Sequence, residues 1–176
     1  MKPPHSGNDL GSLAGPSDSV STVGGWLRVC HPLLAVLAVS GVALAVAGVC
    51  YPVAGLIDER MGKWITLPPF EFRRWHFVVL GLVVSPIVET FFFQFLIFKG
   101  ASFVGTLRRH PWWVVVLSAV IFGGQHFYSA GSIFISTFVG GVFAGGYLLA
   151  GAKRRAFWVV TAAHAIVNLV ALVVKW

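Results

Sequence analysis

The chain has 176 residues, of which 57% are hydrophobic and 11% are charged, and its mean hydropathy is +0.82. Soluble domains carry about 25% charged residues, so this composition excludes an ordinary soluble domain and indicates an integral membrane protein. The net charge of +7 comes from basic residues in short loops between apolar runs, which favours contact with the lipid bilayer over nucleic acid binding.

The chain is expected to form an all-α polytopic transmembrane helix bundle behind a short tail. Residues 1–27 are rich in Gly, Ser and Pro and are predicted to be a disordered tail, whereas 28–176 form the helical core. The first apolar run has 25 residues, too long for a signal peptide, whose apolar region is about 7–15 residues. About five spans are predicted, at residues 33–57, 76–98, 112–128, 132–150 and 157–174.

The basic residues predict an orientation for these spans. With five spans, the N-terminus and the second and fourth connections share one side of the membrane and carry eight Lys and Arg residues, against five on the other side. Cytoplasmic loops are enriched in Lys and Arg, so the N-terminus is expected in the cytoplasm.

Glu89 lies in the middle of the second predicted span. A carboxylate at the centre of a spanning helix costs about 2.5–3.5 kcal/mol on insertion scales, so it usually marks a functional site. His126, His164 and Asn168 lie at a similar depth in later spans. Together they predict an active site inside the bilayer, although a polar cluster that only holds helices together is the alternative interpretation.

Residues beside Glu89 are candidates for supporting roles. Pro86 removes one helical hydrogen bond and should bend the helix just before the acid. Thr90 and Gln94 are four residues apart and share one helix face, where they would either support the site or form hydrogen bonds between helices.

The later spans carry three further patterns. Phe122 and His126 are one turn apart around two glycines, which predicts close approach of a neighbour and a supporting role for Phe122. His164 and Asn168 are also one turn apart, so an imidazole and an amide could donate to a developing oxyanion or simply bond between helices. Phe138, Gly141 and Gly145 predict a helix-packing face without chemistry of its own.

These motifs resemble the CPBP family of CAAX-processing and bacteriocin-processing intramembrane proteases, also called Abi proteins. The family pattern is Glu-Glu-xxx-Arg, Phe-xxx-His, Phe-xx-Gly-xxx-Gly and His-xxx-Asn on successive helices. Here Glu89 opens the first motif, and the others follow in the same order across residues 76–172. The chain departs from the pattern at Thr90 and Gln94, which replace the second glutamate and the arginine.

The resemblance implies a glutamic-type intramembrane endopeptidase in a prokaryotic plasma membrane. Glu89 and His126 would activate water, His164 and Asn168 would hold the oxyanion, and no cofactor would be needed. Its substrate would be a membrane protein or peptide, for example one with a C-terminal sorting tail. Zinc bound by the two histidines and the glutamate is the less favoured mechanism, since the would-be ligands come from three helices.

Two other classes of protein remain open at this point. A small transporter or proton relay would also place Glu and His in the membrane, but it would usually show an internal repeat, which this sequence lacks. A non-catalytic immunity or scaffold protein could share the fold, and the neutral Thr90 and Gln94 are compatible with it.

Overall fold

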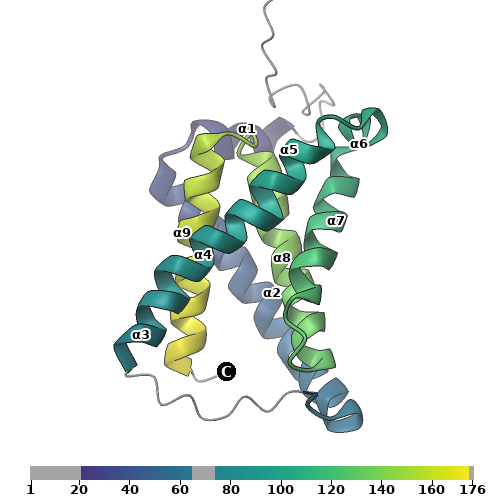
Figure 1. The fold of residues 1–176 in the computed structure, drawn as a ribbon. Coiled ribbons are helices and arrows are strands. Elements are labelled where there is room, and N and C mark those ends of the chain that lie inside the picture. The colour runs from purple at the N-terminus through teal and green to yellow at the C-terminus, as the bar shows by residue number, and fades with distance from the viewer. Residues whose placement is uncertain (1–20, 65–73, 175–176) are drawn as a thin grey trace, which may run out of the picture.

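A computed structural model describes residues 21–64 and 74–174, and within these ranges the chain is a bundle of helices (Figure 1). The predicted all-α fold is confirmed. The elements in chain order are α1 (Ser21–Val29), α2 (Pro32–Met61), α3 (Arg74–Val79), η2 (Leu80–Val84), α4 (Ser85–Glu89), η3 (Thr90–Leu96), α5 (Ile97–Ala101), α6 (Gly105–Arg109), α7 (Pro111–Gly124), α8 (Ala130–Leu149) and α9 (Arg154–Val174).

Four helical stretches among the described residues are long and apolar enough to cross a membrane: Pro32–Met61, Leu80–Ala101, Ala130–Leu149 and Arg154–Val174. The third predicted span is shorter than expected. It is α7, whose 14 residues extend about 21 Å, less than the roughly 30 Å of a bilayer core.

The expected span 112–128 is therefore wrong at its C-terminal end, because α7 ends at Gly124. Two adjacent glycines weaken the helix there. Ser129 begins the next helix as its N-cap, so residues 125–129 must form the turn between the two helices. His126 lies in this turn rather than on a helix.

The structure describes only the last part of the predicted N-terminal tail of residues 1–27, since residues 1–20 lie outside the described residues. Residues 21–27 belong to α1, so for them the expectation of a disordered tail is wrong. The physical reason is that α1 packs on the bundle through the buried Leu27. The Arg155 guanidinium also donates to the carbonyls of Arg28 and Cys30, which fixes the helix to the start of α9.

Small residues let the helices approach closely around α8. The buried residues Ala35, Val39, Ala43 and Ala47 recur every four positions along α2 and form the face that packs against α8. A Cβ atom at Gly146 of α8 would lie only 3.1 Å from Val39. In a membrane, helix association depends on such close packing because lipid is as apolar as the side chains.

Gly141 and Gly145 of the predicted packing face lie against α7, since a Cβ at Gly141 would be 3.6 Å from Ala119 and one at Gly145 would be 4.0 Å from Trp112. Phe138, by contrast, is 49% exposed. A closer approach is at Gly140, where a Cβ would lie 2.7 Å from the ring of Phe122. Gly140 extends the packing face because Phe122 of α7 fills the space beside it.

We predict that Gly123→Ala destabilises the protein by about 1–3 kcal/mol, because the new Cβ would lie 2.9 Å from the Cα of Thr137 in α8. The matched control is Gly124→Ala on the same helix, where a Cβ meets nothing within 4 Å. Alanine is the better helix former, so this control should be neutral or stabilising by up to about 1 kcal/mol. Thermal unfolding in detergent measures both, and equal behaviour of the two variants would contradict the packing described here.

Candidate active site

Glu89 lies on a long helix with an irregular backbone. Two π-helical segments, Leu80–Val84 and Thr90–Leu96, flank the α-helical turn Ser85–Glu89. Pro86 lies in the first turn of the α-helical segment and has no N–H to donate, and the bend expected there stays a prediction. Short π-helical turns are frequent at functional sites because they re-aim neighbouring side chains.

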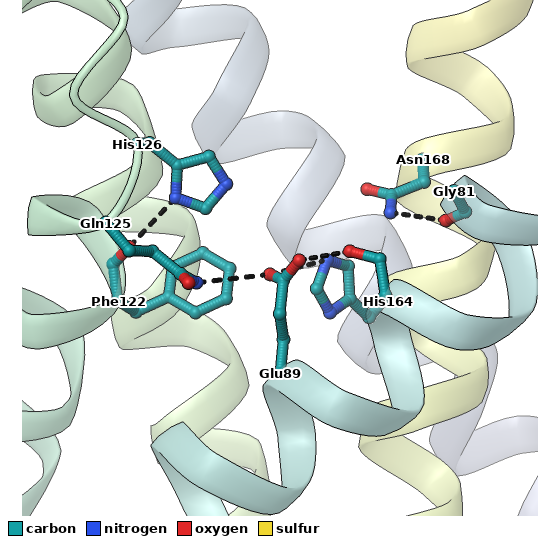
Figure 2. Close-up of polar contacts among 8 residues, drawn as sticks. Gly81, Glu89, Phe122, Gln125, His126, His164 and Asn168 are labelled. Atoms are coloured by element: carbon teal, nitrogen blue, oxygen red, sulfur yellow. Dashed lines mark hydrogen bonds and ion pairs between the residues drawn. The ribbon is translucent and has the colours of Figure 1, made fainter. Parts of the chain in front are cut away.

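Polar groups from three segments of the chain surround the Glu89 carboxylate (Figure 2). The Ser85 hydroxyl, one turn earlier, donates to Oε1. The Gln125 amide, just after α7, donates to Oε2 across 3.4 Å. The His164 Nε2 of α9 lies 3.7 Å from the same Oε2, and the Glu89 side chain is 17% exposed. The carboxylate is thus compensated on several sides although it lies inside the bundle.

His164 is held by aromatic neighbours and is only 4% exposed. Its ring centroid lies 4.7 Å from that of Phe143 and 5.7 Å from that of Phe122. These two rings come from α8 and α7, so three helices fix the imidazole beside Glu89. Its Nδ1 has no hydrogen-bond partner among the described residues.

His126 reaches the same region from the turn after α7. Its Nδ1 lies 2.9 Å from the Phe122 carbonyl oxygen, and its ring centroid lies 5.0 Å from that of Phe122. We assign the tautomer with hydrogen on Nδ1, since the carbonyl can only accept. Nε2 then carries the free lone pair, and Figure 2 shows this ring beside that of Phe122. Phe122 therefore contacts both imidazoles, as a supporting residue would.

Asn168 forms a hydrogen bond between helices, which was one of the two interpretations that the sequence left open. Its amide nitrogen donates to the Gly81 carbonyl at 2.8 Å, in the π-helical segment before Glu89 (Figure 2). One of the two amide hydrogens is therefore used to hold α9 against this irregular backbone. The second hydrogen is left for another acceptor.

Thr90 and Gln94 are completely enclosed but form no part of the carboxylate's hydrogen bonds. They are 0% and 1% exposed. The Thr90 hydroxyl and both polar atoms of the Gln94 amide have no hydrogen-bond partner among the described residues. The structure thus puts these two side chains inside the bundle and not on the carboxylate.

Two residues around Glu89 escaped the sequence analysis. Ser85 has a recognisable signal, because a hydroxyl four residues before an acid lies on the same helix face. Gln125 has no such signal, since its contact with Glu89 joins residues 36 positions apart. It depends on how the end of α7 packs against α4.

Metal ligands do not converge in the described part of the chain. Among residues 21–64 and 74–174, no three His, Cys, Asp or Glu side chains form a group that could hold a metal ion. Glu89 and His164 are in contact, and the Nδ1 of His126 is directed at the Phe122 carbonyl, which leaves Nε2 of that ring free.

The chain matches a model of a known protein family. The model is described as "Type II CAAX prenyl endopeptidase Rce1-like" and matches residues 71–170, which are 100 of the 176 residues. The matched region begins before Glu89 and includes His126, His164 and Asn168. No curated protein matches the chain, and neither does any solved structure.

We predict that Asn168→Leu lowers the free energy of unfolding by about 1–3 kcal/mol, because the Gly81 carbonyl loses its side-chain donor. Thr161→Val on the same helix is the matched control, since it also replaces a polar side chain by an apolar one of similar size. The Thr161 hydroxyl has no partner among the described residues, so this variant should be neutral or stabilising. Thermal unfolding in detergent compares them, and a stable Asn168→Leu protein would contradict the anchoring role.

Proposed function

Because the chain belongs to the Rce1-like family of type II CAAX prenyl endopeptidases, we propose that it hydrolyses a peptide bond in the C-terminal tail of a membrane-associated protein. The family consists of intramembrane endopeptidases, and the chain is an integral membrane protein with several long apolar helices. The proposal extends this to the reacting groups: Glu89 and His126 activate water, and His164 and Asn168 bind the oxyanion.

The observation that carries the proposal is the environment of the Glu89 carboxylate. It lies inside the bundle, yet Ser85, Gln125 and His164 surround it, and His126 follows Gln125 in the turn after α7. Helix–helix association alone would not need an acid and two imidazoles at one depth. General acid–base catalysis does need such a group of proton acceptors and donors.

In the proposed reaction, a water molecule between Glu89 and His126 attacks the carbonyl carbon of the scissile bond. The water gives one proton to the Glu89 carboxylate while the free Nε2 of His126 accepts a hydrogen bond from it. The tetrahedral intermediate then breaks at the C–N bond, and Glu89 returns the proton to the leaving nitrogen. The same residue thus acts first as base and then as acid, which completes the proton balance.

His164 and Asn168 are the proposed donors to the oxyanion. They lie one turn apart on α9, and both contact the helix that carries Glu89, one through Oε2 of Glu89 and the other through the Gly81 carbonyl. Asn168 keeps a second amide hydrogen for the substrate. A single oxyanion donor of this kind contributes about 2.7–4 kcal/mol of barrier reduction.

The distribution of basic residues supports the orientation predicted from the sequence. The end of the bundle formed by α1, α6 and the α8–α9 connection, at the top of Figure 1, collects the basic residues Arg28, Arg108, Arg109, Lys153, Arg154 and Arg155. Cytoplasmic ends of membrane proteins carry such an excess. We therefore propose that this end lies at the cytoplasmic face.

We predict that the purified protein in lipid vesicles cleaves a fluorescence-quenched peptide that ends in a prenylated cysteine followed by three residues, the C-terminal motif named by the family. Glu89→Gln and His126→Ala should each lower the rate by about 10²–10⁴. The first removes the group that takes a proton from the water, and the second removes the group that accepts a hydrogen bond from it. Glu59→Gln is the matched control: it makes the same chemical change at an exposed acid of α2 and should leave the rate unchanged.

Normal turnover by Glu89→Gln would refute the proposed role of this carboxylate. A folded wild-type protein that cleaves neither this peptide nor its unprenylated form would refute the endopeptidase activity on C-terminal tails.

We further predict that cleavage persists after treatment with a strong chelator, because the proposed reaction uses the side chains of Glu89, His126, His164 and Asn168 and no metal ion. The measurement is the rate before and after chelation, together with the metal content of the active protein. Zinc bound one-to-one, whose removal stops cleavage and whose return restores it, would require a metalloprotease mechanism instead.

A further inference from the structure

Asp58, near the C-terminal end of α2, binds the N-terminus of α8. Its Oδ1 accepts a hydrogen bond from the Gly131 backbone N–H at 2.7 Å, and its Oδ2 accepts one from the Ser129 hydroxyl at 2.9 Å. Gly131 is in the first turn of α8, where backbone N–H groups have no partner within the helix. A carboxylate there also interacts favourably with the helix dipole.

The first turn of α8 is pressed directly onto α2. A Cβ at Gly131 would lie 2.6 Å from Oδ1 of Asp58 and would collide with the Ala54 carbonyl oxygen. The connection after α2 adds two backbone contacts, since the Trp64 N–H donates to the Tyr128 carbonyl at 3.0 Å and Lys63 forms a bridge with Ser129. Glycine is needed at Gly131 so that Asp58 can reach the helix terminus.

The cap that Asp58 completes also holds the turn that carries His126. Ser129 is the N-cap of α8, and its hydroxyl accepts from the Ser132 N–H at 3.0 Å while the Ser132 hydroxyl accepts from the Ser129 N–H at 3.0 Å. The Ser132 hydroxyl also lies 2.5 Å from the His126 carbonyl oxygen, to which it can donate. His126 is therefore tied to α7 through Phe122 and to the α8 cap through Ser132.

We propose that Asp58 is a positioning residue that fixes His126 beside Glu89 by capping α8. The contacts run from Asp58 to Ser129, from Ser129 to Ser132, and from Ser132 to the backbone of His126. Asp58 lies outside residues 71–170, the region that matches the family model, so this support comes from a part of the chain that the family description does not cover. Its consequence for catalysis rests on the function proposed above.

The test compares Asp58→Leu, Asp58→Asn and the control Glu59→Gln with the wild-type protein in lipid nanodiscs. Backbone hydrogen–deuterium exchange over residues 125–132 reports the protection of the amides in this turn without any substrate. Asp58→Leu should raise exchange in this segment and leave α9 unchanged. Asp58→Asn should keep most of the protection, because the asparagine amide oxygen can still accept from the Gly131 N–H and its NH2 group can donate to the Ser129 hydroxyl.

Kinetics with the prenylated peptide give the second measurement. A displaced catalytic group can cost about 10²-fold in rate, so Asp58→Leu should lower kcat by about that factor while KM stays nearly constant. Asp58→Asn should recover most of the loss, and Glu59→Gln should match the wild type. A general loss of folding would instead lower the amount of active protein, and Asp58→Asn would then not restore kcat. If Asp58→Leu fails to fold, Asp58→Asn can still be measured.

The outcomes separate this proposal from the function on which it rests. Unchanged exchange over residues 125–132 in both Asp58 variants overturns the proposal, whatever the activity. Raised exchange with an unchanged kcat overturns the positioning role, since His126 would then not need the turn. If the wild-type protein cleaves no peptide, the proposed function fails, and the exchange data still decide whether Asp58 holds the His126 turn.

Discussion

The carboxylate of Glu89 imposes the main constraint on this bundle, because an acid within a membrane-spanning helix must find polar neighbours inside the protein. Those neighbours come from different parts of the chain: Ser85 from its own helix, Gln125 from the turn after α7, and His164 from α9. The three segments must therefore meet at one depth. The packing of α7, α8 and α9 against the Glu89 helix follows from this requirement as much as from apolar contact.

The irregular backbone around Glu89 fits the same constraint. In a regular helix, the backbone N–H and C=O groups pair with one another. Irregular backbone within a membrane is tolerated where other protein groups bond to the backbone groups that lose their partners. The Asn168 amide bonds to the Gly81 carbonyl in the π-helical segment, and the Ser118 hydroxyl of α7 donates to the Phe93 carbonyl at 2.5 Å in the other one. Each π-helical segment thus has a side-chain partner from a neighbouring helix.

Features set by local spacing could be predicted from the sequence. The helical fold follows from the apolar runs, and the similar depth of Glu89 and His164 allows their contact but does not by itself require it. Sequence reasoning failed where a feature depends on the relative position of distant segments. The end of α7 reflects the capping of α8 by Ser129, and the close approach of Gly140 to α7 depends on the position of Phe122.

Asn168 illustrates the same limit for chemistry. A spacing of four residues correctly puts His164 and Asn168 on one face of α9, but it cannot say which atom each side chain meets. The neighbouring helix crosses α9 so that His164 reaches Glu89, whereas Asn168 reaches the backbone eight residues earlier. In this pair, His164 contacts the Glu89 carboxylate, and Asn168 holds α9 against the helix that carries Glu89. Substitutions at Asn168 are therefore expected to affect folding as well as any role in catalysis.

The neutral residues Thr90 and Gln94 give this site a different electrostatic balance from the Glu and Arg of the motif that it resembles. From Leu80 to Phe98 the helix carries Glu89 as its single Asp, Glu, Lys or Arg residue. Without a guanidinium on this helix, the charge of Glu89 is balanced by the hydroxyl of Ser85, the amide of Gln125 and the imidazole of His164. Neutral donors stabilise an anion less than a paired cation does. The contact of His164 with Glu89 and the turn that carries His126 therefore make the correct placement of these imidazoles a condition for the proton transfers proposed here.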